Sequence, residues 1–160
     1  MPIIKDGAIV ADETRHLADD EAATGAVFTV SFARWQSEKE NLKASGASLG
    51  VRLAGNDPVA AIAADLPHLA LVVVEFPALA DGRGFSIARL LRDRYGFTGE
   101  IRARGDFIRD QVYFLGRVGV NAFEPTNTSH LDALLPALTE FTVNYQAAAD
   151  DKQPLYRRRG

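Results

Sequence analysis

Five short apolar runs recur along the chain at intervals of about 20 to 30 residues, and each is followed by turn residues and an amphipathic segment. This spacing is typical of βα units, in which each strand leads into a helix that returns to the same sheet. The sequence therefore predicts a single α/β domain with a mostly parallel, five-stranded sheet and flanking helices, open in the Rossmann or flavodoxin manner. The predicted strands are Ala26–Ser31, Ser48–Leu53, Leu69–Glu75, Glu100–Arg104 and Val120–Phe123.

The third predicted strand is apolar at every position from 69 to 74, which indicates that both of its faces are covered. Helices on both sides of a parallel sheet would provide this cover, so we expect the strand to be central. A partial TIM-like barrel is the alternative architecture, because βα units also build barrels, although five units cannot complete the usual eight-stranded closure.

Turn and capping residues predict the remaining elements. Asp6-Gly7 lies between two apolar pairs, which favours a small N-terminal β-hairpin over residues 3–10, followed by a surface loop. Ser31 can cap a helix that ends at Lys43. Further helices are expected near 107–118 and 131–145, and Pro136 is expected to kink the second of them.

We expect residues 1–149 to form one domain, in which residues 1–25 are the hairpin and loop. Residues 150–160 contain the one basic run of the chain and are expected to be a flexible tail.

Composition excludes several classes of function. The net charge of −3 comes from 21 acidic and 18 basic residues mixed along the chain, which argues against a nucleic-acid partner. The absence of cysteine excludes disulfides, thiolate-bound iron–sulfur clusters and thiol nucleophiles. Without a secretion signal or a membrane-spanning run, the chain is expected to be cytoplasmic and free of membrane. His16, His68 and His130 lack the spacing of a metal site and are expected to be surface or capping residues.

Ligands of parallel α/β sheets bind beyond the carboxyl ends of the strands, where helix N-termini attract anions. This rule selects the loops at residues 75–86 and 104–111, which we expect to converge at one rim. Glu75 ends an otherwise apolar strand, and burial without a partner would raise its pKa toward that of a general acid or base. Alternatively, Glu75 meets solvent or an arginine such as Arg104.

Within the first loop, Gly82 and Gly84 would allow a ligand to approach the backbone, and Arg83 could present paired donors to an oxyanion. The alternative is an ordinary turn with a solvated arginine. A dinucleotide site is not favoured, because Ile87 stands where the third glycine would be.

In the second loop, Asp106 could cap the next helix or transfer a proton, and Arg109 could pair with Asp81. The candidate catalytic residues are Glu75 and Asp106, and the candidate ligand-binding residues are Asp81, Gly82, Arg83, Gly84, Ser86, Arg89, Arg109, Asp110 and Gln111.

These same segments resemble a bacterial family, the domain-of-unknown-function family 934. The resemblance is carried by Glu75-Phe76-Pro77, Asp81 to Arg92, Arg94-Tyr95-Gly96, Gly99 to Ala103, Gly105-Asp106, Arg109-Asp110-Gln111, Gly119 to Glu124 and the N-terminal hairpin. It implies the family's label, an oxidoreductase of sulfite reduction, which reflects genes encoded beside assimilatory sulfite reductase. The family supplies no catalytic residues, and the cofactor is unknown.

Three functions remain open. The chain could be an accessory protein of sulfite reduction that binds a small anion or docks on sulfite reductase. It could be an oxidoreductase that borrows a nucleotide or flavin. It could also be a non-catalytic interaction protein or homodimer, with Phe85, Tyr113 and Phe114 at the interface.

Overall fold

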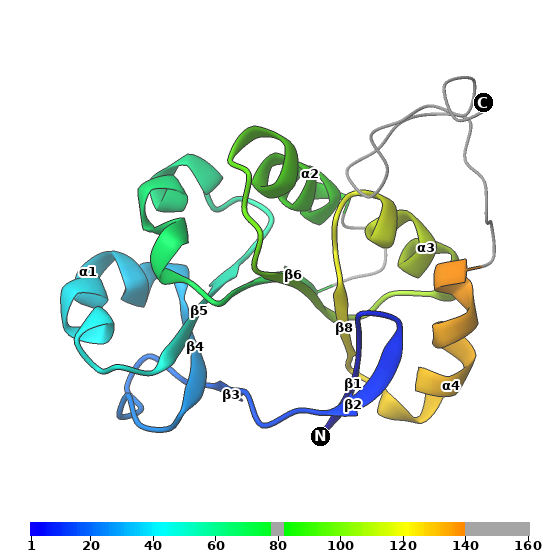
Figure 1. Ribbon diagram of the computed structural model, residues 1–160, viewed down its shortest axis with the longest axis horizontal. Coiled ribbons are helices and arrows are strands. Elements are labelled where there is room, and N and C mark those ends of the chain that lie inside the picture. The colour runs from blue at the N-terminus through cyan, green and yellow to red at the C-terminus, as the bar shows by residue number, and fades with distance from the viewer. Residues whose placement is uncertain (78–81, 140–160) are drawn as a thin grey trace.

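The computed structural model describes residues 1–77 and 82–139 (Figure 1). Within these residues one mixed sheet of eight strands has the order β2-β1-β8-β7-β6-β5-β4-β3. Its strands are β1 (Pro2–Lys5), β2 (Ala8–Ala11), β3 (Arg15–His16), β4 (Val27–Ser31), β5 (Ser48–Leu53), β6 (Leu71–Phe76), β7 (Glu100–Gly105) and β8 (Ala122–Pro125).

The α-helices are α1 (Phe32–Lys43), α2 (Arg83–Arg89), α3 (Arg109–Arg117) and α4 (Leu131–Leu134). Shorter or tighter helical turns are η1 (Val59–His68), η2 (Leu90–Arg94), η3 (Thr128–His130) and η4 (Leu135–Thr139). None of the helices in the described part of the chain is long and apolar enough to cross a membrane.

Strands β3 to β8 are parallel to one another, whereas β1 is antiparallel to both β2 and β8. The prediction of a five-stranded sheet is therefore wrong. All five predicted strands are present, but the hairpin adds β1 and β2 at one edge. The segment expected to be a surface loop adds β3 at the other edge.

The connection between β2 and β3 forces the sheet to curl. These strands lie at opposite edges of the sheet, yet only residues 12–14 join them. A flat sheet of eight strands would be about 34 Å wide, whereas the connection spans at most about 14 Å. The sheet is accordingly a half-barrel, and residues 12–14, the N-terminal strap, run across its open side (Figure 1). This geometry contradicts the open Rossmann-like sheet and agrees with the alternative of a partial barrel.

In the described part of the chain, the helices lie on the convex face of the half-barrel (Figure 1). The convex face carries a buried row of residues that are paired in register, Val30, Val51, Val72 and Ile101. These residues belong to the same apolar core as residues of the helices, among them Trp35 of α1.

The expectation that helices flank both faces of β6 is wrong for a geometric reason. Val73 points to the concave face and is fully buried there, in register between Arg52 and Arg102. Curling a sheet brings the side chains on its concave face together, so Val73 is covered by long side chains from neighbouring strands and needs no second layer of helices.

Turn and capping residues of the sequence predict several local features that the structure contains. Asp6 and Gly7 both have positive φ, 50° and 80°, as a tight hairpin turn requires. Ser31 caps α1, because its Oγ accepts a hydrogen bond of 3.1 Å from the backbone N–H of Arg34. Near the C-terminus, the predicted helix changes from α to 3₁₀ geometry at η4, which contains Pro136. Its last predicted residues and the predicted tail at 150–160 lie outside the described residues.

Candidate ligand site in the half-barrel

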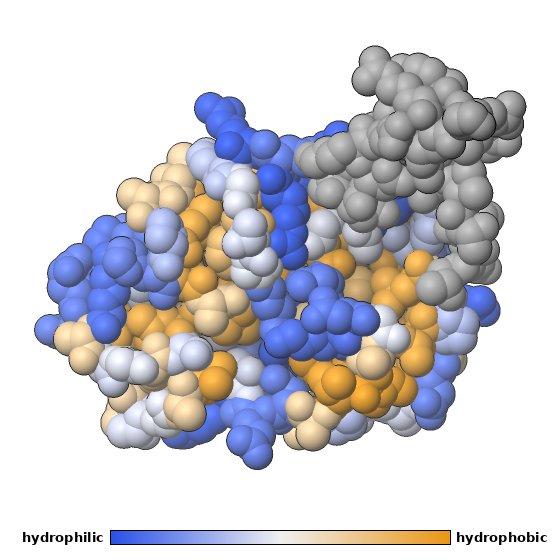
Figure 2. Space-filling view, in the orientation of Figure 1, coloured by the Kyte–Doolittle hydropathy of each residue, from blue (hydrophilic) through white to orange (hydrophobic). Residues whose placement is uncertain are grey.

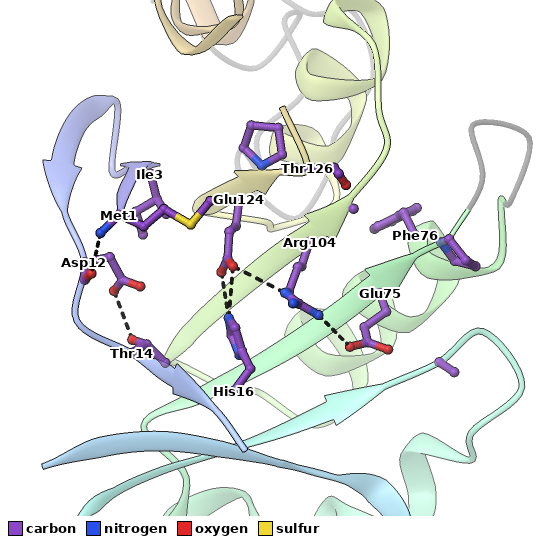
Figure 3. A pocket seen from close by; sticks show the side chains of 14 residues that line it. Met1, Ile3, Asp12, Thr14, His16, Glu75, Phe76, Arg104, Glu124 and Thr126 are labelled. Carbon is purple, nitrogen blue, oxygen red and sulfur yellow. Dashed lines mark hydrogen bonds and ion pairs between the residues drawn. The ribbon is translucent and has the colours of Figure 1, made fainter. Parts of the chain in front are cut away.

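A cavity of about 540 Å³ lies at the carboxyl ends of β5 to β8, on the concave side of the sheet (Figure 3). Its charged and polar walls include Glu75, Arg104 and Glu124 from the sheet and Asp12 and His16 from the N-terminal segment. We call it the charged cavity. Its volume lies within the range of small-molecule sites, about 300–1,000 Å³. In the space-filling view, hydrophilic side chains gather in the middle of the molecule, between hydrophobic areas on both sides (Figure 2).

Glu124 is the hub of this cavity. Its two carboxylate oxygens lie 3.0 and 2.9 Å from His16 Nε2, and it also accepts hydrogen bonds from Arg102 at 3.0 Å and from Arg104 at 3.3 Å. Figure 3 shows its carboxylate between His16 and Arg104. Burial would raise the pKa of Glu124, but the hydrogen bond and charge of His16, together with those of Arg102, lower the pKa to about 2. Glu124 is therefore a carboxylate throughout the neutral range.

Arg102 joins the strap to the sheet. It donates two hydrogen bonds to Asp12, at 2.9 and 3.0 Å, and another to Glu100 at 2.7 Å. Only 1% of its side chain is exposed. Burial would lower the pKa of Arg102, but hydrogen bonds to Asp12 and the charge of Glu100 raise it, so the guanidinium stays charged. These bonds fix the strap across the concave face.

A second polar chain ties β4, β5 and the N-terminal segment together. Arg52 donates to the carbonyl and the hydroxyl oxygens of Thr29, both at 2.9 Å, and to the carbonyl oxygen of Leu17 at 2.8 Å. The hydroxyl of Thr29 also lies 2.8 Å from His16 Nδ1. Both ring nitrogens of His16 are thus engaged, which holds the imidazole in a fixed orientation.

Glu75 and Arg104 are the more exposed members of this network, with 34% and 40% of their side chains accessible. Arg104 uses Nε for Glu124 and Nη1 for Glu75, each at 3.3 Å. Among the described residues, its Nη2 group and the Glu75 Oε2 atom have no hydrogen-bond partner. Glu75 therefore meets an arginine, as the second of the two sequence interpretations expected, and both side chains retain groups that can bind a ligand.

The structure divides the predicted site residues between two places. Glu75 lies in the charged cavity, whereas Asp106 and Arg109 line a neighbouring cavity of about 440 Å³. The first residues of both predicted loops, 75–77 and 104–105, line the charged cavity, whereas residues 82–86 line neither cavity. Asp81 lies outside the described residues.

The glycine–arginine loop has structural roles of its own. A Cβ atom on Gly84 would lie 2.3 Å from the ring of Phe76, so close packing accounts for this glycine. The side chain of Arg83 packs in the same way against Gly55, which follows β5. Gly82 is exposed and precedes α2.

The other predicted residues lie on the surface around α2 and α3. Arg89 is 54% exposed and pairs with Asp93 at 3.4 Å. Ser86 and Asp110 are exposed. Gln111 Oε1 accepts a hydrogen bond of 2.9 Å from the backbone N–H of Ile108 at the start of α3. Asp106 is not the residue that caps α3, because the helix begins only at Arg109, after Ile108.

Sequence reasoning missed most of the charged network, namely Asp12, His16, Arg52, Arg102 and Glu124. The interpretation of His16 as a surface or capping residue is wrong, because only 13% of its side chain is exposed and it binds Glu124. A signal was present in β7, where Glu100, Arg102 and Arg104 alternate with Ile101 and Ala103. This period of two places three charged side chains on one face of the sheet. An apolar layer of helices could not cover that face.

Comparison with curated proteins finds no match. The family model described as "Bacterial protein of unknown function (DUF934)" matches residues 50–156. The matched region contains the last four residues of β5 and all of β6 to β8, and hence Arg52, Glu75, Arg102, Arg104 and Glu124, which contribute side chains to the concave face. Because the match covers more than half of the chain, this protein belongs to the DUF934 family.

Proposed function

We propose that this chain binds a small anion, a sulfur oxyanion, phosphate or carboxylate, in the charged cavity, and acts as an accessory protein of sulfite reduction. The observation that carries the anion site is Arg104, which lines the cavity and whose Nη2 group has no hydrogen-bond partner among the described residues. The connection with sulfite reduction comes from the family resemblance alone.

The geometry of Arg104 favours anion binding because the side chain is already held in place. Carboxylates on the two strands that flank β7, Glu75 and Glu124, bind its Nη1 and Nε groups. Little side-chain entropy would therefore be lost when Nη2 binds a ligand. A guanidinium offers planar, parallel donors that match the oxygens of a carboxylate or oxyanion. Arg52, 3.5 Å from Glu75, adds a second positive charge nearby.

A second candidate function is catalysis with Glu75 as the proton-transferring group. Glu75 is a partly exposed carboxylate in the same cavity as Arg104, and its Oε2 atom has no hydrogen-bond partner among the described residues. An anion bound to Arg104 would therefore lie next to a proton acceptor. Oxidoreductase chemistry at this place would use a borrowed flavin or nucleotide as its electron carrier.

Isothermal titration with sulfite, sulfate and phosphate tests the anion site. We expect one site per chain, and Arg104→Lys should weaken binding about tenfold or more, because lysine keeps the charge but loses the planar pair of donors. Arg89→Lys is the matched control, since Arg89 lies on α2 outside the cavity, and it should leave binding unchanged.

The proposal fails if none of the three anions binds at millimolar concentration, or if Arg104→Lys binds as tightly as the wild type. The sulfite-reduction part is tested separately, by gel filtration of the chain mixed with sulfite reductase. Absence of a complex, together with no effect of the chain on turnover of the reductase, would refute that part alone.

A further inference from the structure

A second, more apolar cavity adjoins the charged cavity. It has a volume of about 440 Å³ and lies between the carboxyl ends of β7 and β8 and helix α4. Both cavities are lined by Gly105, Pro125 and Thr126. The two cavities are therefore neighbours along one rim of the half-barrel.

Gly105 lines both cavities and so belongs to the wall that they share. This residue has a φ of +131°, and a Cβ atom there would lie 2.1 Å from the carbonyl oxygen of Phe76. Its backbone is fixed on both sides, since Thr126 donates to the Gly105 carbonyl oxygen at 3.0 Å and Asp106 donates to Phe76 at 3.0 Å. Position 105 can therefore hold only glycine, and no side chain from it separates the cavities.

The second cavity combines an apolar floor with a polar mouth, and we call it the apolar cavity. Phe107 and Leu134 are buried beneath it, whereas Ile108 is 51% exposed beside it. Asp106 and Arg109 supply polar groups at the same place. A cavity with a mostly apolar lining and a few polar groups is typical of a small-molecule site.

We propose that the two cavities form one site for an amphipathic ligand, with an anionic head group bound to Arg104 and an aromatic or short aliphatic body in the apolar cavity. This inference rests on the proposed function, because the head group occupies the anion position described there. The lining residues that the apolar cavity shares with the charged cavity, Gly105, Pro125 and Thr126, favour a small ligand over a second copy of the chain as the occupant. The anionic head group would give the specificity for this ligand, and burial of its apolar body would give much of the affinity.

Titrations with inorganic phosphate, phenyl phosphate and phenol test this inference. Burying the ring should make phenyl phosphate bind roughly tenfold or more tightly than phosphate, and phenol should bind much more weakly than phenyl phosphate. Ala133 lies on α4, is exposed and lines the apolar cavity. In Ala133→Phe the new ring fills this space, so the ratio of the two phosphate affinities should fall toward one.

Ala60→Phe is the control, because Ala60 is exposed on η1 and lines neither cavity; it should keep the wild-type ratio. Ile108→Gln is a second test that changes the polarity of the side chain but not greatly its volume. It should also reduce the ratio of the affinities for phenyl phosphate and phosphate. Circular dichroism of each variant establishes that it is folded.

The outcomes separate this inference from the proposed function. If phosphate binds but phenyl phosphate binds no more tightly, the apolar cavity is not part of the site, and the anion site stands. If neither phosphate compound binds but sulfite or sulfate does, the amphipathic ligand is refuted and the anion site stands; if none of these anions binds, both proposals fail. If Ala133→Phe instead converts a dimer into a monomer in gel filtration, the occupant is a second copy of the chain, and the amphipathic ligand is refuted.

Discussion

Replacing Glu124 with glutamine removes the one negative charge that His16, Arg102 and Arg104 share. Only 11% of the Glu124 side chain is exposed, so its interactions are weakly screened by solvent. Lowering the pKa of Glu124 from its ordinary value of 4.5 to about 2 corresponds to about 3 kcal/mol of folding free energy at neutral pH. Glu124→Gln should therefore lower the free energy of unfolding by about 3 kcal/mol at pH 7.

The pH dependence of this loss follows from the direction of the shift. Because the pKa of Glu124 is lower in the folded than in the unfolded state, its contribution is complete above about pH 4.5 and is lost as the pH falls through about 2. Glutamine does not titrate. The difference between wild type and variant should accordingly shrink with acid, from about 3 kcal/mol at pH 7 to about 2 kcal/mol at pH 3.5.

Urea unfolding of both proteins at several pH values between 3.5 and 7, followed by circular dichroism, measures this difference. Glu40→Gln is the control, because 81% of the Glu40 side chain is exposed and, among the described residues, that side chain makes only a surface ion pair with Lys43. The control should change stability by less than about 0.5 kcal/mol. A loss below about 1 kcal/mol for Glu124→Gln at pH 7, or a loss that does not vary with pH, would refute Glu124 as the hub of the network.

Two further predictions concern the packing of the half-barrel. Gly84→Ala places a methyl group against the ring of Phe76 and should lower the free energy of unfolding by about 1–3 kcal/mol. Gly116→Ala on α3, whose Cβ would make an ordinary contact with Leu138 of η4, should raise it or leave it unchanged. Thermal unfolding that gives equal effects for both variants would contradict this packing. Asp12→Ala removes two hydrogen bonds to Arg102 and should lower the free energy of unfolding in urea by about 2 kcal/mol or more. Amide hydrogen exchange in the strap should become faster. Unchanged exchange at residues 12–16 would mean that the Asp12–Arg102 pair does not hold the strap.

The parts of the fold that the sequence predicts are those decided by neighbouring residues. The hairpin turn depends on two residues that tolerate positive φ, Asp6 and Gly7, and the start of α1 depends on the hydroxyl of Ser31. The five βα strands are likewise set by local apolar runs and turn signals. In each case the determining interaction spans only a few residues, so that a pattern in one segment is sufficient.

The curl of the sheet and the charged cavity depend on contacts between distant segments. Pairing of β1 with β8 places Ile4 opposite Phe123, and a hydrogen bond from Arg102 to Asp12 holds the strap. No local pattern in residues 11–24 indicates that this acidic stretch crosses the mouth of a barrel. The apolar run of β6 was also ambiguous, because burial of Val73 under charged neighbours produces the same pattern as burial under helices.

The charged residues of the concave face divide into those that hold the fold together and those that can bind a ligand. Buried ion pairs often stabilise a fold no more than well-packed apolar residues of similar size would, so stability alone does not account for so many charges on one face. Asp12, Arg102 and Glu124 have their charges matched within the protein and hold the strap and strands in place. Arg104 and Glu75 are held by these neighbours but keep bonding groups directed at the cavity. A ligand that binds here would therefore exchange water for donors that are already oriented, and the rest of the network supplies that orientation.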